Sequence, residues 1–257
     1  MKLPAPTLKQ TGFSLAELAI VLVIVGLLLT GILMPFATQV QTKRIGETQK
    51  TLDDIREALL GYAASHVAVD GKPYLPCPDT NLDGTEETRT AGACPSQEGW
   101  IPWATLGVGQ ADAWGNHFRY RVHLLVSSSQ TGFTLTSSLA SSPSINVLAS
   151  ASCLPSGTVA SNVAAIILSH GKNGYGARNS SGILNTAATS TDELENTNGR
   201  NAADTSDTVL GGGVTSYDFI TCPARPVEAT AGEFDDVMSW LPSSLLFGKM
   251  IAAGRLP

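Results

Sequence analysis

A nearly continuous apolar run occupies the N-terminal part of the chain. From Leu18 to Phe36 the only polar side chain is that of Thr30. As an α-helix this run would be roughly 28 Å long, close to the hydrocarbon thickness of a bilayer. It is longer than the apolar region of a secretory signal peptide, and Met34-Pro35-Phe36 is a poor cleavage site. The pattern therefore predicts a transmembrane helix, to which we assign residues 13–36.

A second apolar pattern follows with the spacing of an amphipathic helix. Ile45, Leu52, Ile55 and Leu59 recur at intervals of seven, three and four residues. This spacing places them on one face of an α-helix, while charged residues occupy most of the other faces. We predict an amphipathic helix over residues 37–68 that packs its apolar stripe on a globular domain, residues 69–257.

The globular part contains strand-like patterns separated by polar loops. Apolar residues alternate with His117, Arg119, Arg121 and His123, which predicts a half-buried strand over residues 117–126. The apolar run 163–168 predicts a buried strand, and residues 215–222 predict another. The tail, residues 233–257, predicts two short amphipathic helices broken at Pro242. Residues 137–161 and 179–208 read as loops, so the predicted class is α+β with a small antiparallel sheet and long loops.

Charge and composition narrow the range of partners. The chain has 257 residues and a formal net charge of -6, without a cluster of Lys and Arg. Phosphate binding needs such a cluster, so nucleic acid is not an expected partner. Lys2 and Lys9 before the apolar run favour a cytoplasmic N-terminus, but Lys43 and Arg44 after it make the charge signal mixed.

Four cysteines lie downstream of the apolar run, at Cys77, Cys94, Cys153 and Cys222. None forms a C-x-x-C pair, so a structural zinc site has little support. Beyond a membrane segment, an even number of cysteines suggests disulfides in an oxidising compartment. Three connectivities are possible, and free buried thiols are the alternative. We choose Cys77 with Cys94 and Cys153 with Cys222, because the first pair would close one local loop.

A short stretch near the N-terminus resembles the type IV prepilin signal, which type IV pilins share with the pseudopilins of type II secretion. The stretch reads Gly12-Phe13-Ser14-Leu15-Ala16-Glu17, with a short basic leader before it and the apolar helix after it. The commonest family version has Thr in place of Ser14. The resemblance covers residues 1–36. It implies a leader over residues 1–12, cleavage after Gly12 by prepilin peptidase and N-methylation of the new terminus, Phe13.

The resemblance also implies a pilin-like architecture, a place for the chain and a set of partners. The protein would be a single-pass inner-membrane protein with a periplasmic C-terminal domain, and it would enter a helical filament. Its partners would be other pilin or pseudopilin subunits, the peptidase, an inner-membrane assembly platform and the lipid bilayer. Glu17 would neutralise the N-terminal amine of a neighbouring subunit, since pairing lowers the desolvation penalty of both charges. The alternative is a carboxylate in the headgroup layer of an ordinary anchor.

A second resemblance concerns the globular part. Asp112-Ala113-Trp114-Gly115-Asn116 before an aromatic strand is similar to the start of the sheet in major pseudopilins. The processing motif is shared by pilins and pseudopilins and cannot distinguish them. The similarity at residues 112–116 favours a pseudopilin. The family also carries calcium ligands in a loop that follows a turn like the one at residues 169–174. Five acids of this chain could contribute there, but their spacing does not assign them: Asp192, Glu193, Glu195, Asp204 and Asp207.

A candidate calcium loop lies just after the first cysteine. Residues 79–84 read Asp-Thr-Asn-Leu-Asp-Gly and resemble the first half of an EF-hand loop, with oxygen ligands at alternating positions. The candidate ligands are Asp79, Asn81, Asp83 and Glu87, with Glu86 as the alternative to Glu87, although Thr90 stands where the EF-hand pattern places its bidentate glutamate. The alternative is a turn without metal.

Sequence signatures of catalysis are missing. The G-x-S-x-G, H-E-x-x-H, G-x-G-x-x-G and P-loop patterns are all absent. Ser169 and His170 are adjacent on a predicted strand and would point to opposite faces. We therefore predict a structural filament subunit rather than an enzyme. The alternatives are a membrane-anchored periplasmic binding module and a filament-tip adhesin.

Overall fold

The computed structural model describes residues 14–141, 143–153, 155–197, 209–210, 213–214 and 216–257, with residues 29–37, 209–210 and 213–214 described by their backbone alone. The chain divides into two compact units, Met1–Lys43 and Arg44–Pro257. The predicted processing site, Gly12 and Phe13, lies outside the described residues, as do Asp204 and Asp207.

The longest element is helix α1, Leu15–Ser65, which begins in the first unit and continues into the second. In the first unit the large apolar side chains of residues 15–28 are between 43% and 88% exposed. In the second unit three of the four residues of the predicted stripe are buried, with Leu52, Ile55 and Leu59 each 0% exposed, and Ile45 is half-buried. The amphipathic pattern is therefore confirmed for this part of the helix.

The prediction of a membrane-spanning helix is wrong. Within the described residues, no helix has both the length and the apolar character needed to cross a bilayer. The predicted fold class is corrected in this respect, and a single-pass inner-membrane location with a periplasmic domain is not supported.

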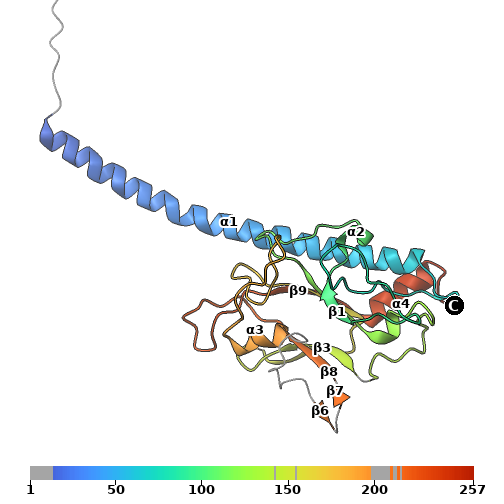
Figure 1. The fold of residues 1–257 in the computed structure, drawn as a ribbon. Coiled ribbons are helices and arrows are strands. Elements are labelled where there is room, and N and C mark those ends of the chain that lie inside the picture. The colour runs from blue at the N-terminus through green and yellow to red at the C-terminus, as the bar shows by residue number, and fades with distance from the viewer. Residues whose placement is uncertain (1–13, 142, 154, 198–208, 211–212, 215) are drawn as a thin grey trace, which may run out of the picture. The chain divides into compact units, whose positions relative to one another are not determined.

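The second unit is built on a four-stranded antiparallel sheet, which confirms the α+β part of the prediction. Its strands are β1, Glu98–Trp100, β2, Arg119–Val122, β5, Ala165–Ser169, and β9, Val237–Leu241, in the order β1-β2-β5-β9. Figure 1 labels the two outer strands, β1 and β9. The C-terminal part of α1 packs on one face of this sheet, where its stripe joins Phe118 and Tyr120 in the larger core.

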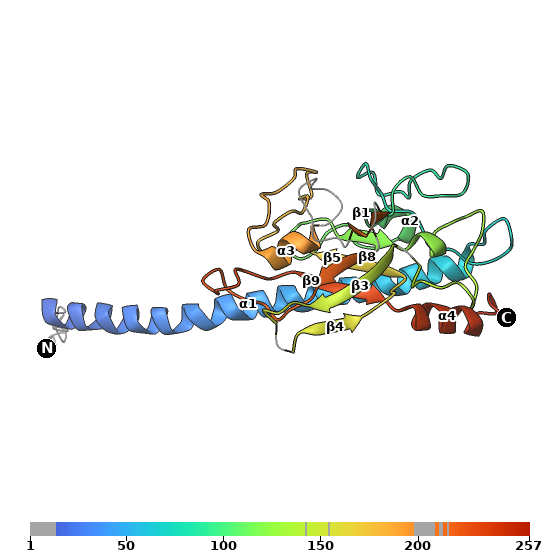
Figure 2. The same ribbon diagram turned by 90° about the horizontal axis from the view of Figure 1, so that it is seen from below.

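A second, smaller sheet covers the other face. It has the order β4-β3-β8, with β3 at Ser144–Ala149, β4 at Gly157–Ala160 and β8 at Ser216–Ile220. Strand β3 pairs antiparallel with β4, beside it in Figure 2, and parallel with β8. Ile166 and Leu168 of β5 face this sheet, whereas Ala165 and Ile167 face α1. Burial on both faces explains why β5 reads as a continuous apolar run. Strands β6, Val209–Leu210, and β7, Gly213–Val214, form a separate hairpin.

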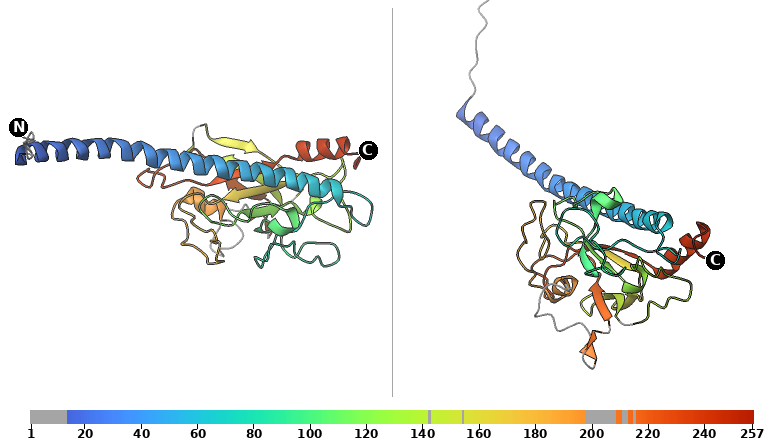
Figure 3. Two further views of the ribbon diagram at one scale, coloured as in Figure 1. Left: turned by 90° about the horizontal axis from the view of Figure 1, so that it is seen from above. Right: turned by 45° about the vertical axis from the view of Figure 1, so that its right-hand side comes forward.

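Four short helical elements are also present among the described residues of the second unit. They are α2, Trp103–Leu106, the 3-10 helix η1, Leu124–Val126, α3, Thr191–Asn196, and α4, Ser243–Ala252. Helix α4 lies beside the C-terminal part of α1 (Figure 3). Arg255, just beyond α4, donates from Nε to the carbonyl of Ala64 at 2.6 Å, and Lys249 lies 4.0 Å from Glu57.

Several local predictions differ from the structure. The stretches predicted as loops contain regular elements: β3 and β4 lie within residues 137–161, and α3 lies within residues 179–208. The last part of the strand predicted over residues 117–126 forms the 3-10 helix η1.

The sequence predicts that strand β2 is half-buried, but it is buried on both faces. Glu98 of β1 forms ion pairs with both Arg119 and Arg121, so these guanidinium groups need not face water. The residues predicted to form the first of the two tail helices form strand β9 instead. This strand pairs with β5, which supplies hydrogen-bond partners for its backbone N–H and C=O groups. The helix after Pro242 is present.

Both predicted disulfides are formed. Cys77 pairs with Cys94, and Cys153 pairs with Cys222. The first closes a loop of 17 residues and the second a loop of 69. Bridges of this kind stabilise a domain by about 2–4 kcal/mol, chiefly by constraining the unfolded chain.

Candidate functional site

The N-terminus of α1 carries the acid singled out in the sequence. Oε2 of Glu17 accepts hydrogen bonds from the backbone N–H and the hydroxyl of Ser14, each at 2.9 Å. The backbone N–H of Glu17 donates to Oγ of Ser14 at 3.2 Å. This reciprocal pair is a capping box, and its S-x-x-E signal is present in the sequence but was missed. The bonds from Ser14 lower the pKa of Glu17, which keeps its carboxylate ionised.

The loop proposed for calcium is a hydrogen-bonded turn. Oδ1 of Asp79 accepts the backbone N–H of Asn81 and Leu82, and its Oδ2 accepts that of Gly84, at 2.7–3.0 Å. Asn81 and Asp83 bond to each other, and Oε1 of Glu87 accepts both donors of Thr80. Side chains of Asp and Asn stabilise turns in this way without metal. Calcium binding by Asp79, Asn81, Asp83 and Glu87 stays a prediction.

The turn at residues 112–116 joins a loop to strand β5 of the main sheet. Oδ1 of Asp112 accepts the backbone N–H of Trp114 and of Asn116, each at 2.9 Å. Its Oδ2 accepts the hydroxyl of Ser169, at the end of β5, at 2.6 Å. The hydroxyl of Ser169 is therefore occupied by a structural hydrogen bond to Asp112. Nδ1 of the next residue, His170, lies 3.5 Å from Oδ1 of Asp236.

Three carboxylates that are distant in the sequence converge at the end of the second unit's main sheet. Glu193 lies on α3, and Asp235 and Asp236 immediately precede β9. One oxygen from each of the three lies within 4.8 Å of the others. The backbone N–H of Glu193 donates to Oγ of Ser190, the N-cap of α3, which fixes the position of this acid. We call Glu193, Asp235 and Asp236 the acid cluster.

Each acid of the cluster has one oxygen that accepts a hydrogen bond and one buried oxygen that accepts none from the described residues, although Oδ1 of Asp236 lies 3.5 Å from Nδ1 of His170. Oε1 of Glu193 accepts from the Asn173 side chain at 2.9 Å, and Oδ2 of Asp235 accepts the Asn173 backbone N–H at 2.8 Å. Oδ2 of Asp236 accepts from the Asn196 side chain at 2.7 Å. Oε2 of Glu193, Oδ1 of Asp235 and Oδ1 of Asp236 are buried and, within the described residues, make no hydrogen bond. Orphaned buried oxygens of this kind are costly.

Backbone geometry holds the cluster tightly. Gly171 has φ +59°, and a Cβ there would lie 2.2 Å from the carbonyl oxygen of Asp235. A side chain at residue 171 would therefore clash with the backbone that carries two of the acids. Glycine tolerates both the left-handed φ and the close approach.

The electrostatics of the cluster favour a bound cation. Burial raises the pKa of Asp235 to about 7, and the charges of Asp236, Glu193 and Glu233 add to the shift. Burial also raises the pKa of Glu193. Calcium prefers oxygen-rich carboxylate sites, and each of the three acids offers one oxygen to a common point. The acid cluster could hold a divalent cation such as calcium, and it includes one of the five loop acids considered from the sequence, Glu193.

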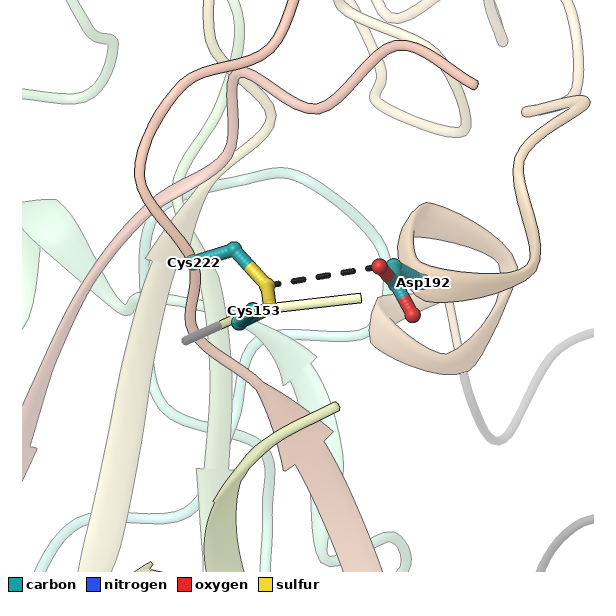
Figure 4. Close-up of side chains that lie close together, drawn as sticks. All are labelled: Cys153, Asp192 and Cys222. Atoms are coloured by element: carbon teal, nitrogen blue, oxygen red, sulfur yellow. Dashed lines mark hydrogen bonds between the residues drawn. A yellow bond between two sulfur atoms is a disulfide. The ribbon is translucent and has the colours of Figure 1, made fainter. Parts of the chain in front are cut away.

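A second grouping of possible ligands has a different explanation. Figure 4 shows the joined sulfurs of Cys153 and Cys222 beside Asp192, whose Oδ2 lies 4.0 Å from Sγ of Cys222. Sulfurs in a disulfide are not thiolate ligands, and Asp192 is ion-paired with Arg225 at 2.5 Å. This grouping is structural, and it ties α3 to the segment after β8.

No family model, curated protein or solved structure matches this chain. The resemblance to type IV prepilins therefore rests on the residues of the chain itself.

Proposed function

We propose that this chain is a structural filament subunit, a pseudopilin or pilin-like protein of a type II secretion or type IV pilus system. Prepilin peptidase would mature it by cleavage after Gly12. The observation that carries the proposal is the exposed apolar surface of residues 15–28 in α1. In that stretch Glu17 is the only polar side chain, and the large apolar side chains are all exposed.

A helix that is apolar on all faces is stable when it is buried. Burying one Leu, Ile or Val side chain contributes about 1.5–3 kcal/mol, and this stretch carries ten such exposed residues. They are Leu15, Leu18, Ile20, Val21, Leu22, Val23, Ile24, Val25, Leu27 and Leu28. In our proposal the same stretches of neighbouring subunits cover them in the filament core.

Glu17 gives such a helix bundle its register. Cleavage after Gly12 would leave a charged amine on Phe13, and a cation among apolar helices needs an anionic partner. The carboxylate of Glu17, one helical turn from that terminus and ionised, is suited to pair with the amine of a neighbouring subunit. A single buried polar pair can fix the axial register of packed helices. The Asp112–Asn116 turn favours the pseudopilin class within this proposal.

The proposal is tested with Glu17→Gln in cells that make the filament machine. The matched control is Glu57→Gln, which removes an exposed acid from α1 in the second unit. Removing one partner of a buried pair costs about 3–5 kcal/mol, so incorporation of Glu17→Gln into sheared filaments should fall at least about tenfold. Glu57→Gln should assemble normally. Equal incorporation of both variants and the unchanged chain would refute the assembly role.

A further inference from the structure

A pocket of about 530 Å³ lies in the second unit, and the filament proposal does not use it. Its volume is within the range of about 300–1,000 Å³ that is typical of small-molecule sites. It shares no residue with the acid cluster or with α1. Its wall includes Trp100 at the end of β1, Trp103 of α2, His117 and Arg178.

Backbone hydrogen bonds hold the walls in place. The backbone groups of Asp79 and Trp100 form two hydrogen bonds with each other, at 2.9 and 2.8 Å. These bonds fix the loop at Asp79 against the end of β1, which carries the indole of Trp100. The backbone N–H of His117 donates to the carbonyl of Arg178 at 2.8 Å, which joins the opposite wall to the loop after Asp112. Walls held in this way need little rearrangement on binding, so a ligand loses little free energy to the ordering of the protein.

Aromatic rings, together with Leu82, form the apolar part of the wall. The ring centroids of Trp103 and His117 are 5.0 Å apart. Burial lowers the pKa of His117, so its ring is uncharged at neutral pH. Indole faces offer a broad apolar surface, together with a polar edge.

Arg178 is the only lining residue with a formal charge at neutral pH. Its guanidinium lies 5.4 Å from the ring centre of Trp100, and its Nη1 donates to the carbonyl of Gly182 at 2.6 Å. Among the described residues no carboxylate forms an ion pair with it. The guanidinium is therefore held in a fixed position with its charge available to an anion.

The remaining polar wall is neutral. Thr80 and Asn81, from the loop considered for calcium, line the pocket together with Gln110, Ser180 and Ser181, and all five side chains carry neutral amide or hydroxyl groups. A purely aromatic acid would remove these groups from water without giving them partners, which is unfavourable. A polyhydroxylated ring would satisfy them and still place its C–H face on an indole. We propose that this pocket binds an acidic sugar, with the carboxylate on Arg178 and the ring against the half-buried indole of Trp103.

The test is calorimetric titration of the full chain, kept in solution by a zwitterionic detergent without a sugar headgroup. The probes are glucuronate, glucose, which lacks only the carboxylate, and benzoate, which lacks the hydroxyls. Glucuronate should bind saturably and quench tryptophan fluorescence. Glucose and benzoate should each bind at least about tenfold more weakly, since each loses one class of contact.

Three variants assign the binding to this pocket. Arg178→Gln should reduce glucuronate affinity to that of glucose, while Arg178→Lys should keep part of the preference. Arg255→Gln removes a guanidinium outside the pocket and should change nothing. Unchanged near-UV circular dichroism will show that each variant is folded. The inference is overturned if glucuronate does not bind, if glucose or benzoate binds equally well, or if a folded Arg178→Gln keeps the preference. None of these results bears on filament assembly.

Discussion

Ser14 and Glu17 bond to each other in both directions, at 2.9 Å from the Ser14 donors to the carboxylate and at 3.2 Å in return. The pair satisfies backbone donors that the first turn of a helix otherwise leaves free. Glu17 thus has a local role as a cap and, in our proposal, a second role in assembly. The two roles can be separated by experiment.

Ser14→Ala removes the cap but leaves the carboxylate. We expect the start of α1 to lose about 1 kcal/mol of helix stability, seen as a small loss of helical circular dichroism. Incorporation into filaments should stay close to that of the unchanged chain, because the charge of Glu17 remains. If Ser14→Ala blocks assembly as completely as Glu17→Gln, capping rather than charge pairing explains the effect.

Two leucines of the same helix should behave in opposite ways. Leu27 is 70% exposed in the first unit, whereas Leu52 is 0% exposed in the core of the second. Leu52→Ala should lower the free energy of unfolding by about 2–5 kcal/mol, measured by denaturant titration. Leu27→Ala should leave that free energy unchanged and reduce incorporation into filaments. Normal assembly of Leu27→Ala together with weakened folding would contradict the proposed role of the exposed surface.

The acid cluster should respond to calcium. Saturating calcium should stabilise the chain, by about 2.7 kcal/mol at a hundredfold excess over Kd, and raise its Tm. Asp235→Asn should remove most of this response and, without calcium, should raise Tm because it relieves repulsion with Glu193 and Asp236. Asp83→Asn, in the loop after Asp79, is the matched control. A calcium response that Asp83→Asn abolishes and Asp235→Asn preserves would move the site to that loop.

The same cluster predicts a pH dependence for the metal-free chain. The pKa of Asp235 is raised in the folded state from 3.8 to about 7, so the folded chain binds more protons than the unfolded chain between these values. Its contribution to stability is therefore full below about pH 4 and is lost as the pH rises towards 7. Tm in the presence of a chelator should fall over this window, and Asp235→Asn should flatten that part of the profile. A profile identical in the variant would exclude this cause.

Periodic features of the fold could be predicted from the sequence. The stripe of Leu52, Ile55 and Leu59 follows helical spacing, and the apolar run at β5 is typical of a strand buried on both faces. The pairing of Cys77 with Cys94 could be predicted because the two cysteines are 17 residues apart and close one local loop. Each of these depends on residues that are close in the sequence.

Features that depend on distant partners could not be predicted. Arg119 and Arg121 read as a solvent face until Glu98 is placed on the neighbouring strand. The acid cluster joins residues 42 positions apart, and only the fold brings Glu193 to Asp235. The tail residues before Pro242 have a helical pattern, but pairing with β5 makes them a strand. In each case the outcome depends on contacts between segments that are far apart in the sequence, and in the tail these contacts override the local preference for a helix.

The most direct test of the filament proposal is the N-terminus of the protein purified from its native source. Intact mass and N-terminal fragmentation should give a chain that begins at Phe13 and carries one N-methyl group. That result would establish processing after Gly12 and the matured terminus with which Glu17 is proposed to pair. A chain that begins at Met1, from cells with an active prepilin peptidase, would contradict the account.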